Sequence, residues 1–217
     1  MKNWTRSSTA SWETDCCSIS PSRNAMAALQ AGVRPREAIV MGKRSLFPRI
    51  PQDAYPTPAE AIAPLLPHLA PNTRFIEPCC GDGHLVGHLK RAGHVLVGAY
   101  DLPDDARVKR YDGLEDGAVF ITNSPWRRDV LHPIILNLSD QAPTWLLIDA
   151  GWVHTRQSEL YLPRLRIIVS VGRVKWIKDS PFTGKDDCAW HLFDLPRPDG
   201  RAVTHFIGRT DSMRRAA

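Results

Sequence analysis

The tetrapeptide Asn-Ser-Pro-Trp at residues 123–126 directly follows the apolar run 118–122. A short apolar run predicts a buried strand, so the tetrapeptide would stand at the carboxyl end of that strand. The side-chain oxygen of Asn123 and the backbone oxygen of Ser124 are neutral hydrogen-bond acceptors, and Pro125 would restrict the turn that holds them. Two such acceptors suit the two hydrogens of an amino group. The alternative is an ordinary turn at a strand end, followed by a tryptophan of the core.

A second candidate site is a glycine-rich turn between an apolar strand at 74–78 and a helix at 84–93, with another strand at 95–101. Gly81 and Gly83 leave this turn without side chains. A ligand could therefore lie against the backbone N–H groups that open the helix. A tight turn that binds nothing is the alternative.

Three acidic residues near this turn indicate the kind of ligand it would take. Asp101 ends the strand at 95–101, where a carboxylate could accept the hydroxyls of a ribose. Glu77 and Asp82 would repel phosphate groups, but they would favour a ligand that carries an ammonium group. The turn is therefore a poor match for a dinucleotide pyrophosphate.

The segment FIEPCCGDG resembles the E-P-x-x-G-x-G loop of class I S-adenosylmethionine-dependent methyltransferases. The tetrapeptide NSPW resembles the [D/N/S]-P-P-[Y/F/W] motif of the amino-methyltransferases that act on adenine N6 or cytosine N4. The order YPTP, glycine loop, tetrapeptide is that of the adenine-N6 group, and residues 172–194 look like the closing segment of small phage-type DNA adenine methyltransferases. The resemblance covers roughly residues 53–194.

The resemblance implies S-adenosyl-L-methionine as the cofactor, without a metal ion. It implies a cofactor site at Thr57, Pro58, Glu77, Cys79, Gly81, Gly83, Asp101 and Asp112. In that site Thr57 and Pro58 would lie by the methionine end of the cofactor, Asp101 would hold the ribose, and Asp112 would bind the adenine amino group. A solvated turn is the alternative for Asp112.

The resemblance also gives Asn123, Ser124, Pro125 and Trp126 the catalytic role. An exocyclic amine on a purine is a poor nucleophile because its lone pair is delocalised into the ring. The Asn123 side-chain oxygen and the Ser124 carbonyl would stabilise the pyramidal nitrogen of the transition state. Trp126 would stack on a target base turned out of its helix. The family usually has proline where this chain has Ser124, and serine loses one backbone restraint.

Two further groups of residues are weaker candidates. His84 and His88 have a helical i, i+4 spacing near Cys79 and Cys80, which could ligate zinc, but helix-surface histidines beside a cofactor loop are the preferred interpretation. A second group interleaves cations with tryptophans and is made of Lys175, Trp176, Lys178, Lys185 and Trp190. It could contact a nucleic-acid strand, or form a solvated hairpin with core tryptophans.

Composition and charge divide the chain into two parts, residues 1–50 and 51–217. The first part holds eight Lys and Arg against three Asp and Glu, which accounts for the whole formal net charge of +5. It lacks sustained periodicity, so we expect a basic, flexible tail with one short helix near 23–30. The second part is expected to be the methyltransferase domain. The five cysteines lack paired spacing, which argues against a disulfide framework or a structural zinc site.

Apolar periodicity predicts an α/β domain. The expected strands are 74–78, 95–101, 118–122, 144–149, 165–171 and 189–194, with a further short strand ahead of Asp112. The expected helices are 58–68, 84–93, 127–138 and 157–161. Alternation of helices with unbroken apolar strands predicts a mostly parallel sheet with helices on both faces. The resemblance makes this a Rossmann-like methyltransferase fold with an antiparallel strand near the C-terminus.

Three functions remain open from the sequence. The leading one is methyl transfer to adenine N6 in DNA. Enzymes with similar turns also methylate RNA bases and protein glutamine amides, which is the second function. The third is a cofactor-fold binding protein that has lost catalysis. No segment has the length of a membrane span or the apolar block of a secretory signal, so we expect a cytoplasmic protein. Few residues remain for a recognition domain, so specificity would be short, supplied by the tail, or borrowed from a partner or a dimer.

Overall fold

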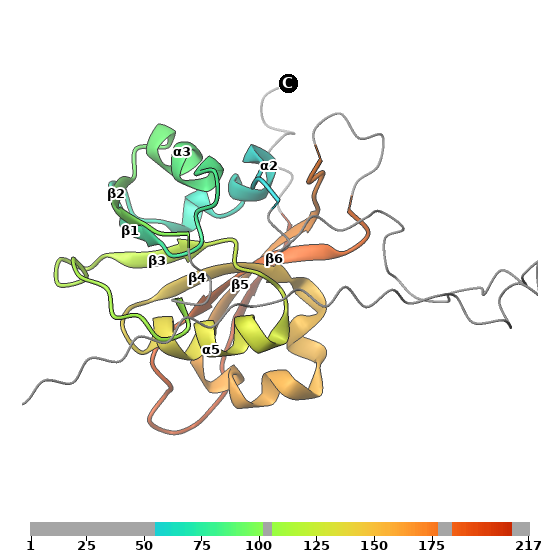
Figure 1. The fold of residues 1–217 in the computed structure, drawn as a ribbon. Coiled ribbons are helices and arrows are strands. Elements are labelled where there is room, and N and C mark those ends of the chain that lie inside the picture. The colour runs from blue at the N-terminus through green and yellow to red at the C-terminus, as the bar shows by residue number, and fades with distance from the viewer. Residues whose placement is uncertain (1–54, 102–105, 178–183, 210–217) are drawn as a thin grey trace, which may run out of the picture. The chain divides into compact units, whose positions relative to one another are not determined.

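The computed structural model describes residues 55–101, 106–177 and 184–209 (Figure 1). The predicted tail at 1–50, its boundary at residue 50 and its short helix near 23–30 lie outside these residues. So do Cys16, Cys17 and Lys178. The described cysteines Cys79, Cys80 and Cys188 are free thiols.

The described residues form short helices around one sheet. The α-helices are α2 (Ala59–Ile62), α3 (His84–Arg91) and α5 (Arg128–Ser139). The 3-10 helices are η2 (Leu66–His68), η3 (Ala150–His154), η4 (Arg156–Leu160) and η5 (Leu162–Arg164). The strands are β1 (Arg74–Glu77), β2 (Val95–Ala99), β3 (Val119–Thr122), β4 (Thr144–Asp149), β5 (Leu165–Arg173), β6 (Asp187–Phe193) and β7 (His205–Ile207).

In the described part of the chain, the sheet has seven strands in the order β2-β1-β3-β4-β6-β5-β7. The strands β2, β1, β3 and β4 pair in parallel, while β6 runs antiparallel to both of its neighbours, β4 and β5. This arrangement confirms the Rossmann-like, mostly parallel sheet and its antiparallel strand near the C-terminus. Because the crossovers return each parallel strand in the same direction, their carboxyl ends meet at one edge of the sheet.

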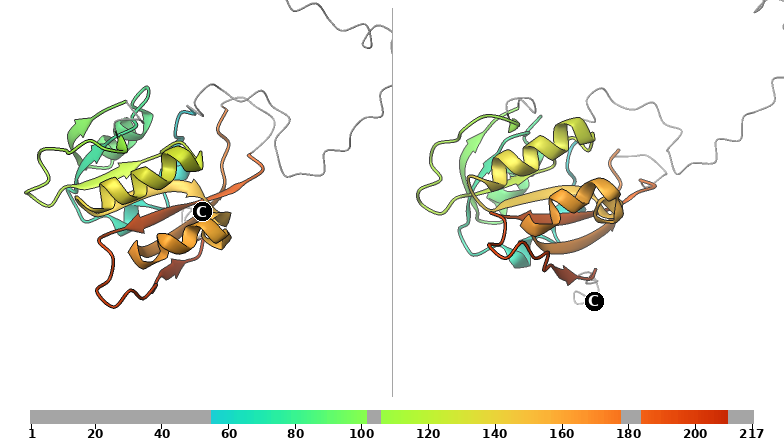
Figure 2. Two further views of the ribbon diagram at one scale, coloured as in Figure 1. Left: turned by 60° about the horizontal axis from the view of Figure 1, so that its bottom comes forward. Right: turned by 90° about the horizontal axis from the view of Figure 1, so that it is seen from below.

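Helices cover both faces of the sheet. Figure 1 shows α2 and α3 on one face and α5 on the other. The right-hand view of Figure 2 looks onto the α5 face and shows the orange 3-10 helices beside α5. Each face has its own apolar core, and the central strands β1, β3 and β4 between them are buried on both sides. Burial on both sides explains why these strands read as unbroken apolar runs.

Successive side chains of strand β4 alternate between the two apolar cores. Trp145 and Leu147 pack into the α3-side core, whereas Leu146 and Ile148 pack into the α5-side core. All four side chains are at most 4% exposed. Alternation along a strand sends neighbouring side chains to opposite faces, so a central strand needs apolar residues at every position.

Three expected elements differ in the structure. The helix predicted at 58–68 is broken into α2 and η2, because Pro64 and Pro67 cannot donate the backbone hydrogen bonds of a continuous helix. The helix predicted at 157–161 is part of a run of 3-10 turns. No strand forms at 106–118, so the prediction of a short strand ahead of Asp112 is wrong for these residues.

None of the helices in the described ranges is long and apolar enough to cross a membrane.

Candidate functional site

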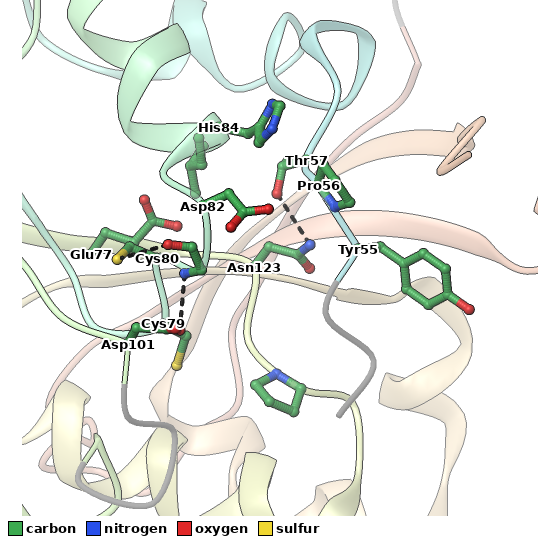
Figure 3. A pocket seen from close by; sticks show the side chains of 13 residues that line it. Tyr55, Pro56, Thr57, Glu77, Cys79, Cys80, Asp82, His84, Asp101 and Asn123 are labelled. Atoms are coloured by element: carbon green, nitrogen blue, oxygen red, sulfur yellow. Dashed lines mark hydrogen bonds between the residues drawn. The ribbon is translucent and has the colours of Figure 1, made fainter. Parts of the chain in front are cut away.

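A cavity of about 200 Å³ lies at the carboxyl ends of β1 and β3. Its walls come from 55–57, from the β1–α3 connection at 77–85, from Asp101 after β2, and from 123–125 after β3. Figure 3 shows these segments meeting around a common space. Ligands of open α/β sheets bind at this edge, outside the carboxyl ends of the strands.

The glycine turn is fastened to the end of β2. The Gly81 N–H donates to Asp101 Oδ1 at an N···O distance of 3.0 Å. The Cys80 N–H donates to the Tyr100 carbonyl at 2.7 Å, and Cys79 forms an isolated antiparallel bridge with Asp101. One carboxylate oxygen of Asp101 therefore holds the turn in place beside the cavity.

Gly81 and Gly83 are required by their backbone conformations. Their φ angles are +46° and +75°, in the left-handed region that favours glycine, and Gly83 is the N-cap of α3. A Cβ atom built at either residue would meet no atom within 4 Å. The space beside the turn is thus open, as a ligand that lies against the backbone would need.

Glu77 is the most unusual titratable group of the site. It ends β1 with only 1% of its surface exposed, and it accepts a hydrogen bond from the Val86 N–H in the first turn of α3. Its Oε2 atom is buried and has no hydrogen-bond partner among the described residues. Burial, with a smaller contribution from the charge of Asp101, raises the pKa of Glu77 to about 8. A cationic group in the cavity would supply the missing partner and favour the carboxylate.

Cys79 also lines this part of the cavity as a neutral group. Burial raises the pKa of its thiol to about 12, and the nearby Glu77 and Asp101 charges act in the same direction. A thiol held neutral is a poor nucleophile, so Cys79 contributes shape to the site.

Asn123 is hydrogen-bonded to Thr57 in the wall of the cavity. Its Nδ2 atom donates to Thr57 Oγ1 at 3.2 Å, as Figure 3 shows. Thr57 is only 5% exposed and stands just before α2, 66 residues away in sequence. With its amide nitrogen on Thr57, the carboxamide of Asn123 has its oxygen left as an acceptor at the end of β3.

The other residues of the tetrapeptide have different surroundings. Pro125 lines the cavity, but Ser124 is 3% exposed and buries its Oγ atom without a hydrogen-bond partner among the described residues. Trp126 donates from Nε1 to the Leu147 carbonyl of β4 at 3.0 Å. Its indole is therefore held against the sheet and does not line the cavity.

An aromatic row leads from Trp126 to the cavity. The rings of Trp126 and Trp176 meet edge to face with centroids 6.1 Å apart, and those of Trp176 and Tyr55 lie 6.4 Å apart. Tyr55 lines the cavity. The aromatic row of Tyr55, Trp176 and Trp126 thus joins three distant parts of the sequence, and Tyr55 is its member at the cavity.

The structure brings seven of the expected site residues to the cavity wall: Thr57, Glu77, Cys79, Gly81, Asp101, Asn123 and Pro125. It leaves five outside the wall: Pro58, Gly83, Asp112, Ser124 and Trp126. Pro58 is the N-cap of α2. Asp112 is exposed in the connection that forms no strand.

Sequence reasoning did not assign Tyr55, Pro56, Cys80, Asp82, His84 and Leu85 to the site, and all six line the cavity. Their neighbours in sequence were the available signal. Tyr55 and Pro56 belong to the YPTP segment, and the other four belong to the glycine turn and the start of α3. Asp82 had been expected to favour an ammonium group, and it adds a third carboxyl group to the wall.

The proposed zinc alternative has little geometric support. The ring of His88 accepts a hydrogen bond at Nδ1 from Arg91 at 2.8 Å, while His84 lines the cavity. Within 55–101, 106–177 and 184–209, no three His, Cys, Asp or Glu side chains cluster closely enough to hold a metal ion.

The two tryptophans of the Lys/Trp group have different environments. Trp190 is fully buried on β6 and donates from Nε1 to the Ala61 carbonyl of α2 at 2.7 Å. Trp176 is partly buried in the aromatic row, and the neighbouring Lys175 is exposed. Among the described residues of this group, Trp176 is therefore linked to the cavity through its contact with Tyr55.

No protein-family model matches this sequence, and no curated protein sequence matches it. Among solved structures, the chain is similar to a TehB-like SAM-dependent methyltransferase from Corynebacterium glutamicum, at 15% identity and a TM-score of 0.40. That likeness covers 63% of this chain and 86% of the other. It is also similar to a release-factor-specific protein-(glutamine-N5) methyltransferase from Alicyclobacillus acidocaldarius, at 19% identity and a TM-score of 0.33, over 62% of this chain and 88% of the other. Both likenesses are too remote to indicate a substrate or a cofactor.

Proposed function

We propose that this protein is an S-adenosylmethionine-dependent methyltransferase that methylates an exocyclic amino nitrogen, with adenine N6 in DNA as the preferred target. The observation that carries this proposal is the position of Asn123. Its carboxamide stands at the carboxyl end of β3, in the wall of a cavity whose other wall holds Glu77 and Asp101. A neutral acceptor and an acidic pocket thus share one space of about 200 Å³.

The residues of the cavity fit S-adenosylmethionine. The buried, unpartnered Oε2 of Glu77 suits the ammonium group of the methionine part, and Asp82 adds negative charge for a cationic ligand. The open space beside Gly81 admits a ligand against the backbone. Asp101, which holds Gly81 through one oxygen, would accept a ribose hydroxyl through the other. When bound, this cofactor supplies a methyl group on a positively charged sulfur.

The chain's own residues would prepare the amine for attack. The Asn123 Oδ1 atom and the Ser124 carbonyl would accept hydrogen bonds from the two amine hydrogens and so favour a pyramidal nitrogen. Its lone pair would then bond to the methyl carbon as the methyl–sulfur bond breaks, which leaves a neutral thioether. Positive charge develops on that nitrogen, and neutral acceptors stabilise it without taking the proton in advance. Pro125 restricts the turn, so the acceptors need little reorganisation. After transfer, the nitrogen loses one proton to water.

The aromatic row favours a planar substrate over a protein glutamine. Tyr55 presents an aromatic ring at the cavity wall and is packed on Trp176, which Trp126 supports in turn. A nucleobase can stack on such a ring, with a stabilisation of about 1–3 kcal/mol, whereas an amide side chain gains less. RNA bases share this chemistry with DNA, so RNA stays the nearest alternative, followed by protein glutamine and by cofactor binding without transfer.

The direct experiment supplies methyl-labelled S-adenosylmethionine together with DNA free of methylated adenine, with RNA, or with a mixed protein extract. The expected result is label in DNA, which digestion and mass analysis would identify as N6-methyl-2′-deoxyadenosine. Label in RNA or protein alone would move the proposal to that substrate. Cofactor binding without label in any acceptor would overturn the proposed transfer.

A further inference from the structure

The hydroxyl of Thr57 accepts a hydrogen bond from Asn123 and does not cap the helix that follows. Helix α2 begins after Pro58 and has no side-chain cap, although threonine is a common capping residue. The Thr57 Oγ1 atom instead lies 3.2 Å from Asn123 Nδ2, which donates to it. A residue that could stabilise its own helix is therefore turned toward the candidate catalytic side chain.

The segment that carries Thr57 is fixed to the sheet. Ala61 and Ile62 of α2 are buried, and the Ala61 carbonyl accepts from Trp190 Nε1 of β6 at 2.7 Å. The Glu60 carboxylate accepts from the Lys175 N–H at 2.7 Å. Thr57 is itself 5% exposed, so its hydroxyl has little freedom to move away from Asn123.

The contact matters because a carboxamide has two different ends. Rotation about the terminal bond of asparagine is broad, so an unrestrained amide could present either its oxygen or its NH₂ group. An NH₂ group that faced a substrate amine would place two donors together and leave both unsatisfied. A partner for the nitrogen therefore decides whether Asn123 acts as an acceptor.

We infer that Thr57 is a positioning residue for the transfer reaction: it binds the amide nitrogen of Asn123 and thereby keeps the amide oxygen toward the substrate amine. This inference rests on the proposed function, and it places the Thr57 hydroxyl on the substrate side of the cavity, whereas the resemblance had implied a place by the methionine end of the cofactor. It predicts that the hydroxyl acts on the rate of transfer and leaves cofactor binding largely intact.

The first test compares Thr57→Val, which replaces the hydroxyl by a methyl group, with Thr57→Ser, which keeps it. We expect Thr57→Val to lower kcat at least about tenfold, because one orienting hydrogen bond is lost, with the Kd for S-adenosylmethionine changed less than about threefold. Thr57→Ser should recover most of the lost turnover. Thr73→Val is the matched control, since it makes the same substitution at a threonine whose hydroxyl donates to the Ala70 carbonyl, at the opposite end of β1.

The second test is a double-mutant cycle with Asn123→Asp. A carboxylate has two equivalent oxygens, so either orientation presents an acceptor and no partner is needed to choose between them. Thr57→Val should therefore cost much less in the Asn123→Asp protein than in the parent. A merely structural role of Thr57 would give the same loss in both backgrounds.

The outcomes separate this inference from the function beneath it. Suppose that the wild-type protein methylates DNA. If Thr57→Val then has the kcat of the wild type, or lowers kcat by the same factor in the parent and in Asn123→Asp, only the role of Thr57 is overturned. A Thr57→Val variant that loses cofactor affinity in step with its turnover would also overturn it. A wild-type protein that transfers methyl groups to no acceptor would remove the proposed function and this inference together.

Discussion

The two walls of the cavity differ in charge. The acidic wall, built by 77–85 and Asp101, holds the carboxyl groups of Glu77, Asp82 and Asp101. The neutral wall, built by 55–57 and 123–125, offers a tyrosine ring, a hydroxyl and a carboxamide. A carboxylate binds a cationic ligand strongly, but it is also a base that can take a proton from an amine. Neutral acceptors orient an amine without deprotonating it. In the proposed function, one wall binds the methyl donor and the other prepares its acceptor.

The largest effect expected from the acidic wall is on cofactor affinity. Glu77→Gln removes the charge that faces the ammonium group, so the Kd for S-adenosylmethionine should rise roughly 10- to 100-fold when measured at a pH above the Glu77 pKa. Turnover at saturating cofactor should change far less. Isothermal titration and steady-state kinetics give the two quantities, and Glu159→Gln, at an exposed position on η4, is the control. Equal affinity for both proteins would remove Glu77 from the donor site.

The pH dependence of binding sharpens the same contrast. The free protein holds a proton on Glu77 below its pKa of about 8, and a cationic ligand must release that proton to gain the carboxylate. Affinity should therefore fall as the pH falls below about 8, by at most about tenfold per unit. The dependence should disappear in Glu77→Gln. A wild-type Kd that is constant through this range would contradict the assignment of Glu77 as the partner of the ammonium group.

The smallest effect concerns the aromatic part of the neutral wall. Tyr55→Leu keeps an apolar side chain but loses the ring, so the KM for DNA should rise about fivefold, at the lower end of base–aromatic stacking energies. Tyr55→Phe keeps the ring and should stay near the wild-type KM. Cofactor affinity should be unaffected in both variants. Equal KM values for Tyr55→Leu and Tyr55→Phe would show that the substrate does not stack at this residue.

The central strands were predictable because burial on both faces requires apolar residues at nearly every position. The run 144–149 is apolar at nearly every position, and β4 occupies these same residues because it is buried on both faces. Within the helix predicted at 58–68, Pro64 and Pro67 interrupt an otherwise helical pattern, and the structure breaks the helix there. In such segments helix-breaking prolines compete with the packing of an apolar helix face, and apolar periodicity does not show which of the two prevails.

The site was predictable where it depends on strand ends. Glu77, Asp101 and Asn123 all lie at or just after parallel strands, so the topology alone brings them to one edge of the sheet. Tyr55 was not predictable, because its place at the cavity depends on contact with Trp176, more than one hundred residues later. The indole N–H of Trp126 is likewise directed by tertiary contact, to the Leu147 carbonyl.

The most direct test of the account is a single-turnover comparison of Asn123→Ala with the wild type, alongside equilibrium binding of S-adenosylmethionine. Losing one preorganised acceptor should slow methyl transfer about 100- to 1000-fold, while the Kd for the cofactor stays within about threefold of wild type. Asn72→Gly, at an exposed loop residue with a φ of 57°, is the matched control. Transfer by Asn123→Ala at the wild-type rate would contradict the central claim that a neutral carboxamide prepares the amine.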